Sequence, residues 1–262
     1  NDEWPDAHKH GTGAHAKGVL GFQGKAGFWL VHSAPMFPNF VAKGYDGLQP
    51  TEFKYGQSML CVSLAMAGLN TAAAQVAVGH PWVYSQYLPD ALNASLPAVR
   101  AIIDAGNHKK RNATDVGIRV EDVHTLRGQV FTAFYKTPKW GKFLYEDAVE
   151  PHYGAGMLWE TWMNGVNPTP TFCAHQDGRD YDSVNIRYVK VDGTEWKETK
   201  DHSKWGVSNT RGKYVTCVGD INRQMGMNAR GGGTVCAVNT KVWEAFAATV
   251  ETRDNCTSVQ TA

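Results

Sequence analysis

Two histidine-x-lysine pairs are the residues of this sequence best suited to chemistry: His15 with Lys17, and His202 with Lys204. Residues two apart in an extended backbone point to the same side, so each pair would set an imidazole beside an ammonium group. Such a pair suits a phosphodiester, because the ammonium neutralises non-bridging oxygens while the imidazole attacks phosphorus or transfers a proton. One pair arises by chance in many chains, but two pairs, each beside a predicted strand, indicate a phosphodiesterase built from two halves.

The composition is that of an ordinary globular protein with little net charge. The chain has 262 residues, 42% of them hydrophobic and 19% charged, and its formal net charge is +1. This length suits one large domain or two small ones. A nearly neutral chain has no overall field that would attract it to nucleic acid or membrane. Its ten histidines become cationic in acid, which fits either acid-dependent binding of a polyanion or scattered solvated side chains.

Glycosylation sequons and cysteines together predict a mature secreted or lysosomal chain whose signal peptide was removed. The sequons begin at Asn93, Asn112 and Asn255. No apolar run approaches the roughly 20 residues of a membrane span. The absence of Cys-x-x-Cys spacing disfavours a zinc hydrolase or a redox motif. Five cysteines leave one thiol over, either bonded to a partner outside this chain or buried and free.

Hydrophobic periodicity predicts a chain that mixes strands and helices. Residues 59–64 form a continuous apolar run that predicts a buried strand. The glycine-rich residues 230–234 predict either an anion-binding nest or a plain turn. The other expected strands are 18–22, 27–32, 117–123, 129–135, 183–191, 214–218 and 235–238, and the expected helices are 69–78, 96–105 and 240–250.

Six stretches, in order along the chain, resemble the deoxyribonuclease II family, the acid endonucleases related to the phospholipase D superfamily. They are GAHAKGV at 13–19, GFWLVHS at 27–33 followed by FP at 37–38, YGQSMLCVS at 55–63, DHSKW at 201–205, YVTCVGDINR at 214–223 and RGGGTVC at 230–236. They span nearly the whole chain, whereas residues 85–195 resemble the family only loosely.

The resemblance implies an α/β protein with the two-lobed phospholipase D-like fold, in which mixed β-sheets are flanked by helices. Residues 1–165 would be the remainder of an N-terminal lobe that carries the first pair, and residues 166–262 the C-terminal lobe that carries the second. Family members have a longer segment before the first pair, so the first lobe is expected to be incomplete here. Cleavage into two chains that stay together would account for this, and some two-chain members are venom toxins.

The resemblance also implies a pattern of disulfides and partners. Cys217 would pair with Cys236 and Cys173 with Cys256, which leaves Cys61 for a cysteine in a separate N-terminal chain. DNA is the implied substrate, and a homodimer that encloses a DNA-sized cleft is a further implied assembly. No membrane partner and no cofactor are expected.

By analogy with the superfamily, His15 would attack the DNA phosphorus to form a phosphohistidine. His202 would protonate the departing 5′ oxygen and then activate water, leaving a 3′-phosphate and a 5′-hydroxyl. The reverse assignment of the two histidines stays open. Lys17 and Lys204 would hold the non-bridging oxygens, so no divalent metal is expected. A general acid must begin protonated, and this implies an acidic optimum.

Three further polar residues are weaker candidates. His32 ends an apolar strand, where a histidine is either structural or, by the family match, catalytic. Asp220 and Asn222 lie in an expected turn, where they would bind substrate or orient a histidine, although turn chemistry alone also explains them. The competing function is a DNA-binding or cytotoxic secreted protein that keeps the fold without catalysis. Two intact His-x-Lys pairs favour the enzyme, because a binding protein has no need of both.

Overall fold

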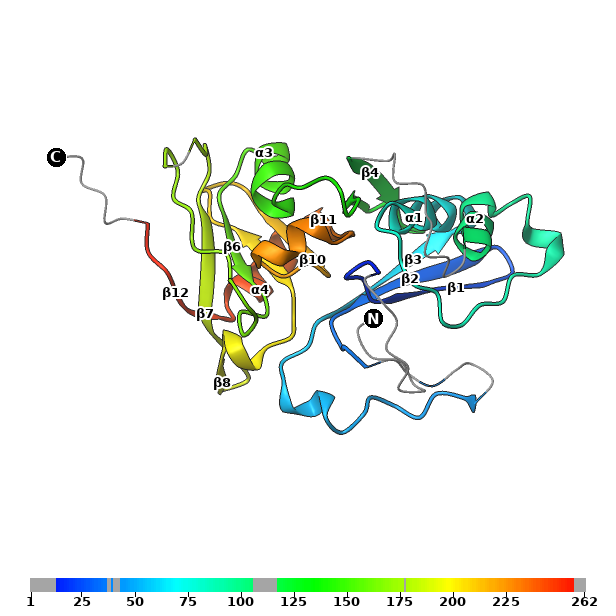
Figure 1. Cartoon of the computed structure of the whole chain (residues 1–262), viewed down its shortest axis with the longest axis horizontal. Coiled ribbons are helices and arrows are strands. Elements are labelled where there is room, and N and C mark those ends of the chain that lie inside the picture. The colour runs from blue at the N-terminus through cyan, green and yellow to red at the C-terminus, as the bar shows by residue number, and fades with distance from the viewer. Residues whose placement is uncertain (1–12, 37–38, 40–42, 106–116, 177, 257–262) are drawn as a thin grey trace.

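The computed structural model of this chain describes residues 13–36, 39, 43–105, 117–176 and 178–256. Within these residues the strands form a three-stranded sheet and a nine-stranded sheet, which lie side by side along the long axis of the molecule (Figure 1). Helices pack on both sheets. The protein therefore has the mixed α/β architecture that the sequence predicts.

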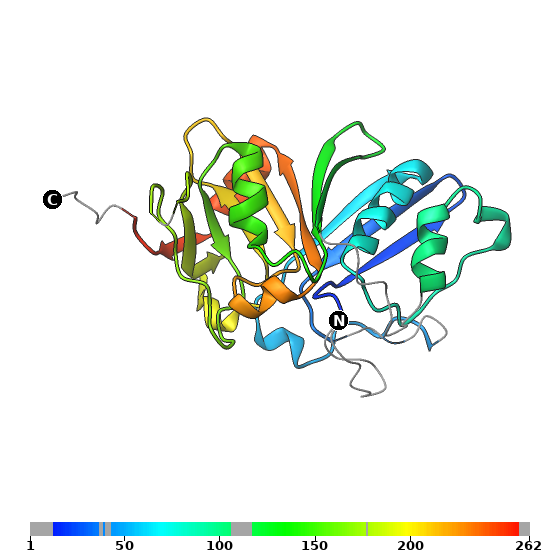
Figure 2. The same cartoon turned by 45° about the horizontal axis from the view of Figure 1, so that its top comes forward.

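The small sheet is antiparallel and is covered by helices on one face (Figure 2). Side chains of that face, such as Trp29 and Leu64, pack with Leu69 of the first helix into one hydrophobic core. Gly24 adopts a φ of +60° in the first turn, a conformation that glycine takes without strain. The elements are β1 (Gly18–Gln23), β2 (Ala26–His32), β3 (Met59–Ala65), α1 (Met66–Val78) and α2 (Pro97–Ala105).

β3 is a strand, as predicted, but the expectation that it is fully buried is wrong. Val62 and Leu64 are buried, whereas Met59 is 50% exposed and Cys61 is exposed. The physical reason is that β3 lies at the edge of the small sheet and is covered by helices on one face only. A continuous apolar run therefore does not distinguish a central strand from an edge strand.

The large sheet is antiparallel apart from one parallel pair, β6 with β7. Its strand order is β12-β7-β6-β9-β10-β11-β5-β4, and β8 pairs with β7. The strands are β4 (Ile118–His124), β5 (Val130–Lys136), β6 (Met157–Glu160), β7 (Ser183–Val191), β8 (Thr194–Lys197), β9 (Trp205–Ser208), β10 (Val215–Gly219), β11 (Gly232–Val238) and β12 (Val250–Arg253).

Both faces of the large sheet are covered, which explains why β6, β9 and β10 are buried along their whole lengths. A π-helical turn (Tyr145–Val149) that continues into α3 (Glu150–Tyr153) packs on one face with Trp159 and Cys217. α4 (Thr240–Ala247) packs on the other face through Trp243 and Phe246. Short 3-10 helices occur at Glu52–Lys54, Asp90–Leu92, Glu198–Lys200 and Met225–Ala229.

The glycine-rich residues 230–234 form neither a nest nor a turn, because from Gly232 onward they belong to β11, where Gly232 and Gly233 pair with β5. A Cβ at Gly233 would lie 2.3 Å from the Phe134 carbonyl oxygen and 2.6 Å from the Tyr135 ring. These glycines therefore allow close approach of the backbone rather than binding of an anion.

The large sheet does not divide at residue 165, the domain boundary expected from the sequence. β4, β5 and β6 precede that residue, yet they pair with β11, β7 and β9, which follow it. The small sheet, in contrast, is complete by Ala65. The division of the chain into two lobes at residue 165 stays a prediction.

Two disulfides are present within the described residues. Cys217–Cys236 joins β10 to β11 at directly paired positions, and Cys173–Cys256 closes a separation of 83 residues. Every helix in the described part of the chain is too short or too polar to cross a bilayer. Of the sequon asparagines, Asn93 is partly exposed and Asn255 exposed, while Asn112 lies outside the described residues.

Replacement of Gly206 tests the tight packing at the centre of the large sheet. A Cβ at this position in β9 would lie 2.1 Å from the Trp159 ring. Gly206 and Trp159 are both buried, so neither residue can shift freely. We expect Gly206→Ala to lower the free energy of unfolding by about 2 kcal/mol. Gly226→Ala, where a Cβ would meet nothing within 4 Å, is the matched control. Thermal unfolding that is equal in the two variants would contradict this packing.

Candidate active site

Both His-x-Lys pairs lie in irregular backbone immediately before a strand, in agreement with the prediction that each pair lies beside a strand. His15 and Lys17 precede β1, and His202 and Lys204 precede β9. His15, Lys17 and Lys204 are about 5% exposed or less, and His202 is half-buried. Each pair is thus held at the entry to a strand by the surrounding protein.

The turn after β10 brings the two pairs together. The backbone N–H of Gly219 donates to the Lys204 carbonyl at 2.8 Å. The next residue, Asp220, accepts a hydrogen bond from the backbone N–H of Lys17 through Oδ1 at 3.0 Å, and its carbonyl oxygen contacts Nδ1 of His15. Residues about 200 positions apart in sequence are therefore anchored on two consecutive residues. Figures 1 and 2 show the start of the described chain beside β10 and β11.

The His15 backbone is held by the residues just before β11. Its N–H donates to the Gly231 carbonyl at 2.8 Å. The Arg230 guanidinium donates to the carbonyls of Gly13 and Ala14 at 3.2 to 3.3 Å. A Cβ at Gly232 would lie 2.7 Å from the His15 carbonyl oxygen. The glycines of this stretch, which have no Cβ, thus allow the backbone of the first pair to pack closely against it.

The His202 backbone is held by the segment between β2 and β3. Gly56 bridges to it on both sides: its carbonyl accepts from His202 N–H at 2.8 Å, and its N–H donates to the Lys200 carbonyl at 3.0 Å. The Asp201 carboxylate accepts from Ser203 N–H and from Trp196 Nε1, both at 2.7 Å. Any Cβ at position 56 would lie 2.6 Å from that carboxylate, so this docking requires glycine.

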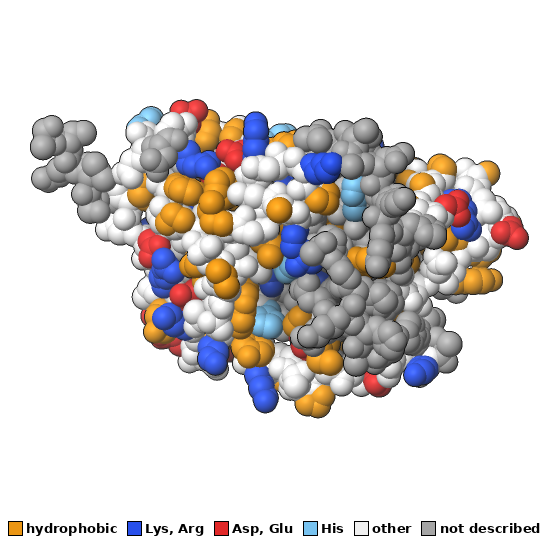
Figure 3. All heavy atoms as spheres, viewed as in Figure 1, with side chains coloured by type: hydrophobic (Ala, Val, Ile, Leu, Met, Phe, Trp, Pro, Cys, Tyr) orange, Lys and Arg blue, Asp and Glu red, His pale blue; other side chains and the backbone are white. Residues whose placement is uncertain are grey.

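Two aromatic rings surround the His202 imidazole. The Tyr55 ring is stacked on it, with centroids 4.3 Å apart and planes 10° apart. The Trp162 ring meets it at 89° with a centroid separation of 4.0 Å. Tyr55 was predicted only as part of a stretch that resembles the family, and Trp162 was not identified from the sequence. On the face shown in Figure 3, histidine, lysine and arginine side chains gather near the middle.

His32, at the end of β2, lies next to the first pair, and the residue after it leads to the second. Its N–H donates to the Lys17 carbonyl at 3.2 Å. Ser33 follows it and exchanges hydrogen bonds with Ser58, whose Oγ lies 3.4 Å from Lys204 N. Burial and then the charge of Lys17 lower the pKa of His32 to about 4. His32 is therefore neutral at pH 5, and a catalytic role for it stays a prediction.

Asp220 and Asn222 are both buried in the turn after β10. Burial raises the pKa of the Asp220 carboxyl to about 7, although the charges of Lys17 and Lys204 act in the opposite direction. Both lysines therefore lie close enough to influence this carboxyl. Oδ1 of Asn222 is buried without a hydrogen-bond partner among the described residues, which leaves it able to accept from a bound group.

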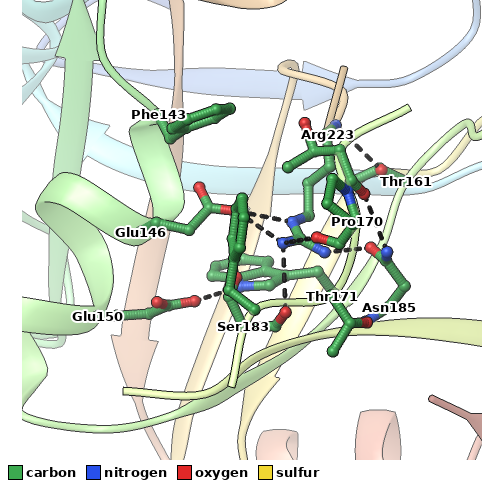
Figure 4. Close-up of polar contacts among 12 residues, drawn as sticks. Phe143, Glu146, Glu150, Thr161, Pro170, Thr171, Ser183, Asn185 and Arg223 are labelled. Carbon is green, nitrogen blue, oxygen red and sulfur yellow. Dashed lines mark hydrogen bonds and ion pairs between the residues drawn. The ribbon is translucent and has the colours of Figure 1, made fainter. Parts of the chain in front are cut away.

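A buried network around Arg223 fixes the turn that carries Asp220 (Figure 4). The guanidinium donates to Glu146 at 2.9 Å, to the Pro170 carbonyl at 3.0 Å and to Asn185 Oδ1. Arg223 N–H donates to Thr161 Oγ1 at 3.1 Å. From the sequence, Arg223 is only the last residue of the family-like stretch 214–223, since its partners lie 38 to 77 positions away.

Glu160 is a buried carboxyl that sequence reasoning missed. It is fully buried at the end of β6, and neither carboxylate oxygen has a hydrogen-bond partner within the described residues. Burial, with the charges of Asp201 and Glu198, raises its pKa, and the charge of Lys204 opposes this. A second protonatable carboxyl therefore lies near Lys204. Nothing in its sequence position distinguishes it from an ordinary strand residue.

The described residues bring one group of three histidine, cysteine, aspartate or glutamate side chains within metal-ligand distance of one another: Cys173, Asp182 and Cys256. Both cysteines are bonded in a disulfide, so this group offers no thiolate to an ion. The arrangement around the two His-x-Lys pairs instead supplies two imidazoles and two ammonium groups. Such a set can provide a nucleophile, an acid and charge stabilisation for phosphoryl transfer.

Comparison with known proteins gives a family match across almost the whole chain. Residues 1–256 match the family described as Deoxyribonuclease II. Plancitoxin-1 of Acanthaster planci is 34% identical over 261 residues, which cover 98% of this chain and 70% of that protein. Deoxyribonuclease-2 of Caenorhabditis elegans is 33% identical over 250 residues, covering 92% and 61%. Deoxyribonuclease-2-alpha of Rattus norvegicus is 32% identical over 260 residues, covering 98% and 72%.

The chain thus spans between three-fifths and three-quarters of the length of these relatives. The match includes both His-x-Lys pairs and the turn after β10 that holds them. This chain belongs to the deoxyribonuclease II family.

Proposed function

We propose that this chain is the catalytic part of an acid endodeoxyribonuclease that hydrolyses DNA without a divalent metal ion. The family supports a deoxyribonuclease. The observation that supports the mechanism most is the anchoring of both His-x-Lys pairs on Gly219 and Asp220. Anchoring the His15 ring and the Lys204 backbone on consecutive residues brings the two pairs to one turn, which suits a two-step transfer of one phosphoryl group.

His15 is the nucleophile in this proposal. A carbonyl oxygen only accepts hydrogen bonds, so the contact with the Asp220 carbonyl requires the proton of the neutral ring on Nδ1. Nε2 then carries the lone pair and attacks phosphorus. The new P–N bond forms while the bond from phosphorus to the 5′ oxygen breaks, which gives a phosphohistidine that retains the 3′ side of the DNA.

His202 is the general acid of the first step and the general base of the second. As an imidazolium it gives its proton to the departing 5′ oxygen, which leaves as a hydroxyl. The neutral ring then takes a proton from water, whose oxygen attacks phosphorus and breaks the P–N bond. The products are a 3′-phosphate and a 5′-hydroxyl, and both histidines return to their starting states.

Lys17 and Lys204 stabilise the charge on the non-bridging oxygens, the role that metal ions have in other nucleases. Their shared influence on the Asp220 carboxyl supports a common location for the two ammonium groups. Below about pH 7 Asp220 is protonated and does not compete with phosphate for them. At higher pH its carboxylate attracts both lysines, which adds a second reason for acidic activity to the protonation that His202 requires.

The proposal extends to partners and location. The exposed Cys61 on the edge strand β3 is proposed to bond an N-terminal chain that completes the small sheet by adding strands to its edges. A homodimer is proposed as the assembly that encloses DNA. A secreted or lysosomal location agrees with the two disulfides and with glycans at Asn93, Asn112 and Asn255.

Plasmid cleavage at pH 5 in excess EDTA tests the mechanism. The native protein is expected to nick DNA, whereas His15→Ala and His202→Ala are each expected to lose activity by about 1,000-fold or more, because each removes one reacting group. His124→Ala, an exposed residue of β4, is the matched control and should cleave normally. The nicked product should accept phosphate from polynucleotide kinase without prior phosphatase treatment, since its 5′ end is a hydroxyl.

Other outcomes of this experiment have distinct meanings. Cleavage that disappears with EDTA would refute the metal-free mechanism. A 5′-phosphate in the product would refute the assigned bond cleavage. DNA retention without cleavage by the native protein, at any pH, would favour the alternative of a DNA-binding or cytotoxic protein without catalysis.

The raised pKa of Asp220 predicts a specific dependence of stability on pH. Its pKa is about 7 in the folded protein against an ordinary value of 3.8, so its stabilising contribution is complete below pH 3.8 and is lost as pH rises through 7. His32, whose pKa is lowered to about 4, acts in the opposite sense: its contribution is present above pH 6.5 and is lost as pH falls through 4.

In Asp220→Asn the group can no longer ionise, but the side-chain oxygen can still accept from Lys17. The melting temperature of this variant minus that of the native protein is therefore expected to rise by about 5 °C between pH 4 and pH 8. Glu244→Gln, an exposed change on α4, should give no such trend. Parallel curves for Asp220→Asn and the native protein would show that Asp220 does not titrate in this range.

A mass measurement tests the proposed bond of Cys61. The protein isolated from its natural source under non-reducing conditions should carry a second polypeptide that is released by reduction, because an exposed thiol in an oxidising compartment forms a disulfide. A Cys61→Ser variant of the full precursor should lack this link. Alkylation of Cys61 without prior reduction would refute the proposed partner chain.

A further inference from the structure

The structure assigns a positioning role to Tyr55: its ring holds the imidazole of His202 in place and favours the imidazolium form. This inference rests on the proposed function, in which His202 is the general acid. It also means that the second His-x-Lys pair depends on the segment between β2 and β3, which connects two strands of the small sheet.

The three rings form a closed cluster. Tyr55 is stacked on the imidazole at 4.3 Å, Trp162 meets the imidazole at 4.0 Å and 89°, and Tyr55 and Trp162 contact each other at 5.4 Å and 83°. Tyr55 follows the 3-10 helix Glu52–Lys54, whereas Trp162 follows β6. Contacts from two directions restrict rotation of the imidazole about its side-chain bonds.

The backbone beside Tyr55 is tied to the backbone of His202. Gly56, the next residue, pairs with Asp201 in a parallel bridge and accepts the hydrogen bond from His202 N–H. Gln57 donates to Glu52 at 3.2 Å and accepts from Ser33 at 2.5 Å. The segment that carries Tyr55 is thus fixed at both ends, which is the condition for positioning another side chain.

Charged groups of both signs lie near His202. Lys204 Nζ donates to the His202 carbonyl, and its charge disfavours the imidazolium. The adjacent Asp201 favours it but already accepts from Ser203 and Trp196, and the buried Glu160 lies near Asp201 and Lys204. Lys200 Nζ lies 5.9 Å from the Tyr55 centroid. The face of a tyrosine ring attracts a cation, so the stack stabilises the acid form.

The alternative role for an aromatic residue beside a nuclease site is to stack on a base of the substrate. One face of the Tyr55 ring is occupied by His202, and the residue is half-buried. It would have to leave the imidazole to receive a base. The geometry therefore favours positioning of His202 over contact with DNA.

The test compares Tyr55→Phe, which keeps the ring, with Tyr55→Leu, which removes it, in steady-state plasmid cleavage from pH 4 to 7 with EDTA. Tyr55→Phe should retain kcat within about twofold. Tyr55→Leu should lose about 10- to 100-fold in kcat with KM nearly unchanged, and the alkaline limb of its pH profile should move down by about half a unit. Tyr87→Leu, which replaces an 83% exposed tyrosine, should match the native protein.

Three results would overturn the assignment. A raised KM with kcat unchanged would mean that Tyr55 contacts DNA. Equal losses in Tyr55→Phe and Tyr55→Leu would mean that the hydroxyl and not the ring is required. Full activity of Tyr55→Leu would mean that His202 needs no support from the ring.

A measurement on the native protein covers the case in which Tyr55→Leu does not fold. Protons above an aromatic ring are shielded, so the His202 ring signals, identified by their loss in His202→Ala, should lie upfield of those of exposed histidines. Unshifted signals would contradict the stack. This readout needs no catalysis, so it distinguishes a failure of the Tyr55 assignment from a failure of the proposed nuclease activity.

Discussion

The hydrogen bonds that Gly219 and Asp220 make to the two His-x-Lys pairs are the contacts on which the site depends. Asp220 holds Lys17 through its carboxyl and His15 through its carbonyl, and Gly219 holds Lys204. Two further sets of contacts hold the turn in place: Tyr145 donates to the Ile221 carbonyl at 2.5 Å, and Arg223 is surrounded by buried acceptors. Burial of a carboxylate is unfavourable, and protonation at acidic pH removes that penalty.

The parts of the site that are local in sequence could be predicted, and those that arise from packing could not. Each His-x-Lys pair and the turn with Asp220 and Asn222 follow from short motifs, and most strands follow from apolar runs. The stack of Tyr55 on His202 joins residues 147 positions apart, from 55 to 202, and no periodicity encodes it. The pKa of Glu160 is raised because the side chain is completely buried. A single charged residue at the end of a strand does not indicate burial from the sequence.

The errors in the predicted secondary structure also arise from packing between segments that are distant in sequence. The apolar run of β3 is half exposed because one face of the small sheet lacks a covering layer among the described elements. The glycines of β11 are required by neighbouring backbone and by the Tyr135 ring, not by a turn. In both places, the partners that decide the structure are brought in by the tertiary fold. The family resemblance supplied the pairing of cysteines, which spacing alone leaves undetermined.

The wide sequence separation of the contacts at Asp220 has a consequence for synthesis. His15 and Lys17 meet their partners 205 and 203 residues later. A nascent chain from which β10 and β11 have not yet emerged cannot form these contacts with the first pair. Contacts of such high sequence separation also form late in folding. The arrangement of the two His-x-Lys pairs is therefore among the last features to assemble. Partially synthesised or partially folded chains lack the contacts that bring the two pairs together.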